Sequence, residues 1–157
     1  MVSPELLRRY PFFAFMTHPQ QQEVAMITEE VEIPGNTILF NIDDMANALY
    51  LLINGSVDLH YVVVDENLPA LRKDFLIGTI NPGEVFSISA MIEPYVLTST
   101  AVTTHPCTLL KIDALALRDL CEQDHDLAYG FQKQLARTTM QRLHATRVLL
   151  AAATAPM

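Results

Sequence analysis

The fold of this chain is decided by residues 49–61, Leu49-Tyr50-Leu51-Leu52-Ile53-Asn54-Gly55-Ser56-Val57-Asp58-Leu59-His60-Tyr61. Two runs of aliphatic, β-branched and aromatic residues flank the pair Asn54-Gly55. Because a type I′ turn needs positive φ at both of its central residues, an Asn-Gly pair between two such runs predicts a tight β-hairpin. We therefore expect a β-sheet to be built around this turn.

Short runs of the same kind fill the centre of the chain, from Val31 to Ile112. The runs of strand length are Thr37 to Phe40, Leu49 to Ile53, Val57 to Val64, Phe75 to Ile80 and Leu97 to Val102. Turn residues separate them at Pro34-Gly35-Asn36, Asn41 to Asp44, Asp65 to Pro69, Asn81-Pro82-Gly83 and His105-Pro106. Many short strands with regular turns predict a barrel, a roll or a sandwich.

Helical patterns flank this β-rich centre on both sides. Residues 4–30 place apolar side chains at helical spacing around Pro11 and Pro19 and predict two short helices. Residues 113–153 predict a short helix near Asp113 to Cys121 and a long one beginning near Asp126, with acidic residues early and basic residues late, as helix dipoles favour. We therefore expect one α+β, mainly β, domain over residues 1–157: N-terminal helices (4–30), a β-roll (31–112) and C-terminal helices (113–153).

Two apolar stripes run along the predicted long helix. One stripe, interrupted by Lys133 and Arg147, is formed by Tyr129, Ala136, Met140, Leu143 and Leu150. The other is formed by Phe131, Leu135, Thr138, Ala145, Leu149 and Ala152. We expect one stripe to cover the roll and the other to meet a partner helix in a homodimer, with the interface at Ala136, Met140, Leu143, Arg147 and Leu150. The alternative is that both stripes pack within a monomer.

The composition excludes several classes of protein. Half of the 157 residues are hydrophobic, which is enough to bury a core. Ten Lys and Arg against eighteen Asp and Glu leave a net charge of -8, so nucleic acid is not an expected partner. Since no apolar run is long enough to span a membrane and the N-terminus lacks a signal-peptide pattern, we expect a cytoplasmic protein with no membrane partner.

The sequence offers no arrangement typical of an enzyme or a metal centre. Cys107 and Cys121 form no CxxC pair and the histidines are isolated, so we expect two buried thiols, no metal and no activated nucleophile. A haem sensor would need an axial ligand such as His105 or Cys107, but His105 before Pro106 is typical of a turn. We expect His60, on a strand, to be an outward or otherwise satisfied polar residue. The chain is therefore expected to be non-enzymatic and to carry no cofactor.

Local motifs resemble the cyclic-nucleotide-binding domain of the catabolite activator protein (Crp/Fnr) family. Ile33-Pro34-Gly35-Asn36-Thr37-Ile38-Leu39-Phe40 and Asn47-Ala48-Leu49-Tyr50-Leu51-Leu52-Ile53-Asn54-Gly55-Ser56-Val57 are similar to its "PGxxIF…ALYxLxxGxV" opening. Ile80-Asn81-Pro82-Gly83-Glu84-Val85-Phe86 is similar to its "LxPGExF" turn, which leads into the ligand cassette. The resemblance covers residues 5 to 150. It implies a double-stranded β-helix (jelly roll) with a long dimerisation helix and a regulatory role in signal transduction.

The predicted ligand cassette departs from the family pattern at its charged positions. Where nucleotide-binding members continue "FGE", this chain has Phe86-Ser87-Ile88-Ser89-Ala90, and where they have "R-S/T-A", Val96 or Leu97 replaces the arginine before Thr98 and Ser99. The resemblance implies that the arginine neutralises the cyclic phosphate and that the glutamate receives the ribose hydroxyl. Hydrogen bonds to charged groups contribute about 1.5–3 kcal/mol each, so losing two implies roughly hundred-fold to ten-thousand-fold weaker nucleotide binding.

A DNA-reading module is not expected from these residues. Transcription factors of the family follow the long helix with a helix-turn-helix domain, whereas only residues 151–157 follow Leu150 here. The leading hypothesis is a stand-alone regulatory sensor or adaptor with a degenerate cassette that binds an uncharged small molecule or another protein. The alternatives are a cyclic AMP or cyclic GMP sensor with atypical contacts from Glu93, Thr98, Ser99 and backbone amides, a fragment of a Crp/Fnr-type regulator, or a structural partner of an enzyme complex.

Overall fold

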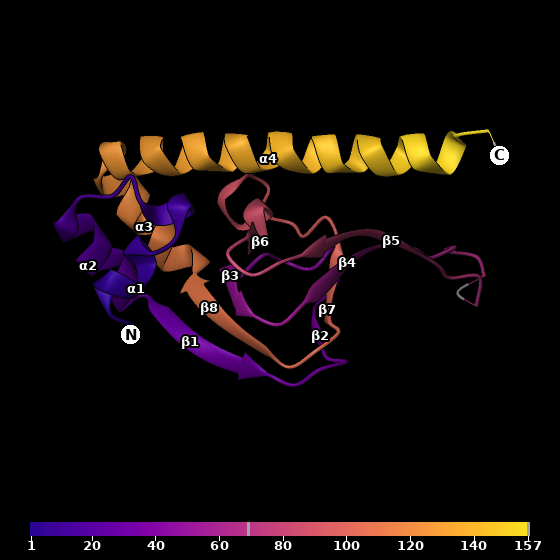
Figure 1. The fold of residues 1–157 in the computed structure, drawn as a ribbon, viewed down its shortest axis with the longest axis horizontal. Helices are drawn as coiled ribbons and strands as arrows, with labels where there is room; N and C mark the ends of the chain where they lie inside the picture. The colour runs from indigo at the N-terminus through magenta and orange to yellow at the C-terminus, as the bar shows by residue number, and fades with distance from the viewer. Residues whose placement is uncertain (69, 157) are drawn as a thin grey trace.

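Two four-stranded antiparallel sheets form the centre of the molecule (Figure 1). The computed structural model describes residues 1–68 and 70–156. The first sheet has the order β1-β8-β3-β6, built from Thr28–Ile33, Cys107–Asp113, Ala48–Asn54 and Val85–Phe86. The second has the order β2-β7-β4-β5, built from Ile38–Phe40, Thr100–Thr103, Val57–Val63 and Lys73–Ile80. Strands distant in sequence are neighbours in space, as in a jelly roll, which is the predicted fold class.

The tight hairpin predicted at Asn54-Gly55 is wrong. β3 and β4 lie in different sheets, so the Asn-Gly pair leads the chain from one sheet to the other. Gly55 has a φ of +106°, whereas Asn54 is not in the left-handed region. A Cβ on Gly55 would lie 2.6 Å from Sγ of Cys107, so close packing as well as φ requires glycine there. Turn chemistry predicts that the chain reverses, but the partner of each strand depends on distant residues.

The other boundaries agree with the predicted ones to within a few residues or differ for visible reasons. β1 begins at Thr28, so the N-terminal helical part ends at Met26 and not at Glu30. β7 begins only at Thr100, because the backbone of Leu97 pairs with the loop at Asp43 and Asp44 and not with a strand. Strands β1, β6 and β8 were not among the predicted runs.

Helices at both ends of the chain lie beside the roll. The N-terminal elements are α1 (Pro4–Arg8), the 3₁₀ helix η1 (Pro11–Phe13) and α2 (His18–Met26); the C-terminal ones are α3 (Ala114–Gln123) and α4 (His125–Thr154). Asp113 and Asp124 begin the last two, since their carboxylates accept hydrogen bonds from the amides of Ala116 (2.8 Å) and Leu127 (3.1 Å). No helix of the described part of the chain is both long and apolar enough to cross a membrane.

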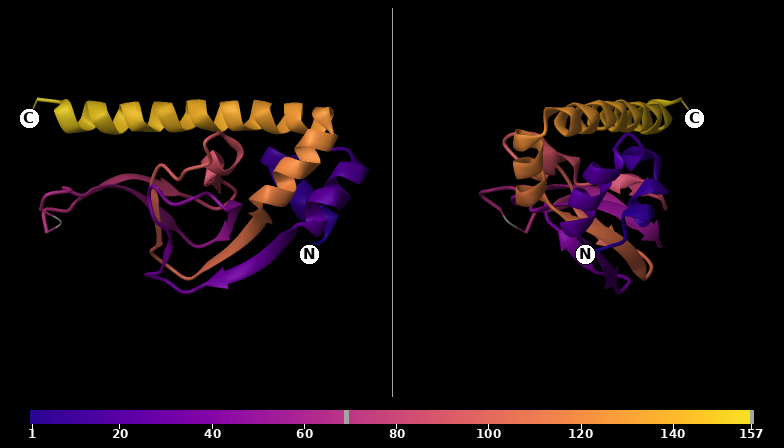
Figure 2. Two further views of the ribbon diagram at one scale, coloured as in Figure 1. Left: turned by 180° about the vertical axis from the view of Figure 1, so that it is seen from behind. Right: turned by 90° about the vertical axis from the view of Figure 1, so that its left-hand side faces the viewer.

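Helix α4 runs along one side of the whole molecule (Figure 2). Its first half is anchored in the core, where Leu127, Phe131 and Leu135 are buried. Phe131 contacts the ring of Phe15 edge-on, with 5.1 Å between ring centroids. The second half passes over β6 and toward the tip of the β4–β5 hairpin, and many of its apolar side chains are exposed. The first half of α4 therefore fixes the position of the second half relative to the roll.

Candidate functional site

A cavity of about 830 Å³ lies between the roll and α4. Its roll side includes β5, the turn before β6 and the cassette, which contains the 3₁₀ helix η2 (Ile88–Met91). Figure 1 shows β6 and the short helix after it directly beneath α4. The helix side of the cavity comprises Gln134, Arg137, Thr138, Thr139, Gln141, Arg142, Ala145, Thr146, Val148 and Leu149. A ligand in this cavity would touch the roll and the helix together.

Most of the predicted cassette residues line this cavity. Those that do are Phe86, Ser87, Ile88, Ser89, Leu97, Thr98 and Ser99. Ala90 does not, because it is fully buried against Ala46, Leu97 and Ala114. Val96 does not either, because it forms an isolated β-bridge with Met45. The structure thus brings the cassette together around Leu97 and leaves Val96 outside.

Ser87 keeps the backbone conformation that glycine would favour. Its φ of +62° and ψ of +38° place it in the left-handed region, which is uncommon for a residue with a Cβ. Its hydroxyl donates a 2.8 Å hydrogen bond to the carbonyl oxygen of Ala48 on β3. That bond helps to hold the turn in this conformation.

Leu97, one of the two positions at which the resemblance places the family's arginine, lines the cavity. It is 4% exposed and packs with the alanines at 46, 90 and 114. Its amide donates to the carbonyl of Asp44 (2.8 Å) and its carbonyl accepts from the amide of Asp43 (2.9 Å). Ile88, at the glutamate position, packs against the main core. The cassette wall is therefore neutral at both positions.

Arg118 of α3 holds the cassette from behind, a role that the sequence analysis missed. Its Nε donates to the carbonyl of Ala90 (2.8 Å) and its Nη2 to the carbonyl of Ala46 (3.0 Å). Its guanidinium also lies 3.7 Å from the centroid of the Tyr95 ring. The residues next to Arg118 in the sequence do not indicate such contacts, because its acceptors come from distant parts of the chain.

Arg142 reaches from α4 into the cavity wall, and the sequence analysis interpreted it only as a favourable charge near a helix end. Its Nη2 donates a hydrogen bond to the carbonyl oxygen of Val85 on β6. Burial lowers the pKa of Arg142, and the nearby Glu84 carboxylate partly offsets this effect. A cation of the helix therefore lies against the strand that leads into the cassette.

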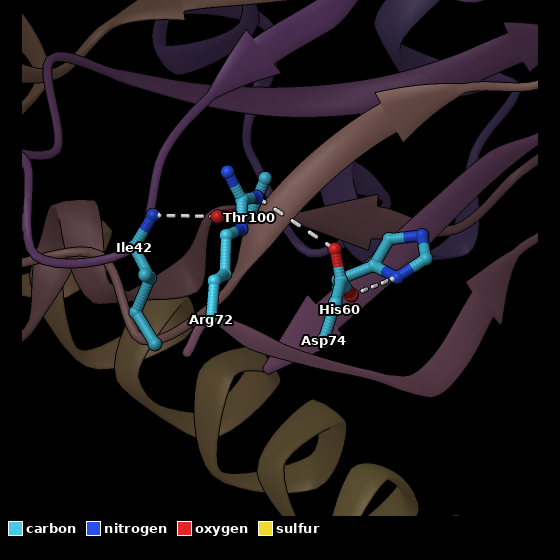
Figure 3. Close-up of polar contacts among 5 residues, drawn as sticks. All are labelled: Ile42, His60, Arg72, Asp74 and Thr100. Carbon is cyan, nitrogen blue, oxygen red and sulfur yellow. Dashed lines mark hydrogen bonds and ion pairs between the residues drawn. The ribbon is translucent and has the colours of Figure 1, made fainter. Parts of the chain in front are cut away.

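His60, the strand histidine predicted to be satisfied, is not among the residues that line the cavity. Its Nδ1 is 2.7 Å from Oδ1 of Asp74 on β5, and Nη2 of Arg72 is 3.7 Å from Oδ2 of the same carboxylate. The Thr100 hydroxyl nearby accepts a 2.9 Å hydrogen bond from the amide of Ile42 (Figure 3). The His60–Asp74 contact joins β4 to β5, so His60 belongs to the β4–β5 hairpin, and the Thr100 contact joins β7 to the loop after β2.

The two cysteines are poorly suited to act as nucleophiles. Cys107 is buried, and its thiol lies within hydrogen-bond distance of the carbonyls of His105 (3.1 Å) and Ser56 (3.4 Å). Cys121 is half-buried, and burial with nearby carboxylates raises its thiol pKa to about 11. Within the described residues, no group of three His, Cys, Asp or Glu side chains is placed to hold a metal ion.

Residues 30–124, more than half of the chain, match the family model of the cyclic nucleotide-binding domain. The chain belongs to this family. A putative cyclic nucleotide-binding protein from Geobacter metallireducens is 33% identical with a TM-score of 0.78, and the alignment covers 92% of this chain and 100% of that one. No curated protein sequence matches the chain significantly.

Two further structures share the fold of this cyclic nucleotide-binding domain. One is a cyclic nucleotide-binding domain from Methylobacillus flagellatus, 14% identical, with a TM-score of 0.76 and coverage of 98% of this chain and 83% of that one. The other is the sensor domain of the transcriptional regulator DNR from Pseudomonas aeruginosa, which is 20% identical with a TM-score of 0.68. The alignment covers 89% of this chain and 90% of that one. The family match ends just before α4, so the helix side of the cavity lies outside it.

Proposed function

We propose that this domain is a non-enzymatic regulatory sensor whose cassette has lost the family's charged contacts to a cyclic phosphate. The observation that carries the proposal is the neutral cassette wall at Ile88 and Leu97. A phosphate monoanion that leaves water for such a wall loses hydration and gains no charge partner from the cassette. Cyclic AMP and cyclic GMP are therefore not its ligands in the manner of the family.

A small molecule suits the cavity better than a protein segment does. Its volume of about 830 Å³ falls within the range of small-molecule sites, about 300–1,000 Å³. Its lining combines apolar side chains such as Leu59 and Leu149 with the hydroxyls of Ser89, Thr98 and Thr138. Because α4 forms one side, occupancy acts on the helix directly.

We further propose that α4 carries the contact to a second copy. Ala136, Met140, Leu143, Arg147 and Leu150, the predicted interface residues, are all exposed in the single chain. A net charge of -8 makes these 157 residues unsuited to bind DNA by themselves. Ligand binding would then change how two copies associate with each other or how a partner protein binds to them.

Titration calorimetry with cyclic AMP and cyclic GMP tests the proposal. We expect no saturable binding of either nucleotide at concentrations up to about 1 mM, because the charge-assisted contacts that would hold the phosphate are missing from the cassette. Light scattering at the same protein concentration gives the oligomeric state in parallel. Micromolar binding of either nucleotide would contradict the proposal and support the alternative of a cyclic-nucleotide sensor with atypical contacts.

A further inference from the structure

Arg142 is a cation in the cavity wall for which no ion pair is found among the described residues, although the Glu84 carboxylate lies near enough to act on it. Among the described residues, no carboxylate lies within 4.0 Å of its guanidinium; the ion pairs found there are those of His60 and Arg72 with Asp74. A guanidinium carries five N–H donors. The one protein acceptor found for them is the carbonyl oxygen of Val85. Among the described residues its other donors have no protein acceptor, and Arg142 lines the cavity.

The other charged groups of the cavity leave it basic. Its charged lining residues are Arg137, Arg142 and Glu84. One oxygen of Glu84, Oε1, accepts a 2.8 Å hydrogen bond from the amide of Asn81 in its own turn. Two cations against one carboxylate make this site locally positive, in a chain whose net charge is -8. A positive cavity in an acidic protein favours an anion over a neutral ligand.

We infer that the cavity binds a small organic anion whose carboxylate or phosphate group is held by Arg142 of α4. The inference rests on the proposed function and adds the ligand class to it. The planar guanidinium is suited to receive two oxygens of such a group at once, while Leu59 and Leu149 contact an apolar body. This differs from the uncharged ligand expected from the cassette alone, because the counter-charge comes from the helix.

The same contact would link the ligand to α4. Arg142 already joins the helix to the strand before the cassette through the carbonyl of Val85. Met140 and Leu143 of the predicted dimer seam lie next to it in the sequence but are 65% and 41% exposed. An anion bound by Arg142 therefore fixes the helix that presents this seam.

Three matched probes test the inference: naphthoate, naphthyl phosphate and the neutral naphthamide. Their affinities are measured by NMR titration, following the Nε–Hε signal of Arg142 and the amides of Ser87 and Leu97. We expect at least one of the two anions to bind about tenfold or more tightly than the amide, since hydrogen bonds to charged groups are the stronger ones. Comparing the two anions distinguishes a carboxylate ligand from a phosphate ligand.

Substitutions then test whether Arg142 causes the preference for the anionic probes. Arg142→Gln keeps a donor near Val85 but removes the charge, and we expect it to weaken anion binding about tenfold to hundred-fold while leaving naphthamide unchanged. Arg137→Gln removes the same charge from an exposed position of the same cavity and is the matched control, with a smaller effect. Arg142→Lys, which keeps the charge, should retain part of the preference and shows that the site still folds.

The inference is overturned if neither anion binds better than naphthamide, if none of the probes binds, or if Arg142→Gln leaves the preference unchanged. These results leave the proposed function standing, because that is judged by the cyclic-nucleotide titration. Conversely, cyclic AMP that binds tightly to the parent and loses affinity in Arg142→Gln would overturn the proposed function and support the anion site.

Discussion

At the scale of single residues, the backbone conformation of the cassette at Ser87 can be distinguished from the side chain that the cassette offers a ligand at Leu97. Ser87 retains a left-handed backbone and a hydrogen bond to β3, so the turn follows the path that the family's glycine would favour. Leu97 occupies the cavity wall but offers only apolar atoms, buried among alanines. Backbone path is maintained by local hydrogen bonds, whereas ligand charge must be matched by a side chain. A substitution can therefore remove a charged side chain from a cassette without changing the path of its backbone.

Restoring the charged groups should restore part of the nucleotide affinity. In the variant Ser87→Gly, Ile88→Glu, Leu97→Arg, we expect calorimetry to detect cyclic AMP, with a gain of about 2–4 kcal/mol from the new hydrogen bonds and charge pair. The matched control carries the arginine at Val96, which bridges Met45 away from the cavity, and should gain much less. If both variants fold and neither gains affinity, the cassette is closed or reshaped, which would favour a protein partner.

At the scale of elements, local signals predicted the helices well, and non-local pairing limited the strands. The two C-terminal helices were expected near Asp113 and Asp126, and they begin at Ala114 and His125, with Asp113 and Asp124 accepting hydrogen bonds from amides three residues ahead. The turn at Asn54-Gly55 was recognised, but β3 pairs with β8 and β4 pairs with β7, and the paired residues are 40 or more positions apart in the sequence. Among the described strands, only the pairing of β4 with β5 is local. In the candidate site, Arg142 was missed because only the packing of α4 on β6 gives it an acceptor.

The packing of α4 on the N-terminal elements depends on Gly130. In an exposed helix, Gly→Ala stabilises by about 1 kcal/mol, but a Cβ here would lie 2.1 Å from the ring of Phe15. We expect Gly130→Ala to lower the free energy of unfolding in urea by about 1–3 kcal/mol, the usual cost of overpacking. In a Phe15→Leu background the smaller side chain should remove most of this penalty. A penalty of the same size in both backgrounds would show that the ring contact is not its cause.

At the scale of the whole molecule, α4 has one face toward the cavity and one face exposed to solvent. Thr138, Ala145 and Leu149 line the cavity. Met140, Leu143 and Leu150 lie on the other side of the helix at 100° per residue and are 65%, 41% and 62% exposed. The helix is anchored at Phe131 and contacts β6 through Arg142, and in the single chain it presents this apolar seam to solvent. A ligand that reaches α4 from the roll thus acts on the element that would join two copies.

Placing charge in this seam tests whether it joins two copies. A carboxylate at Met140 or Leu143 would be buried without a partner in a coiled-coil contact, which disfavours association strongly. We expect light scattering to give a dimer mass for the parent and a monomer mass for Met140→Glu and Leu143→Glu. Gln141→Glu adds the same charge on the cavity side of the helix and should leave the dimer intact. A monomeric parent, or dimers in both seam variants, would mean that the exposed stripe is not an interface and that the ligand signal leaves the domain by another surface.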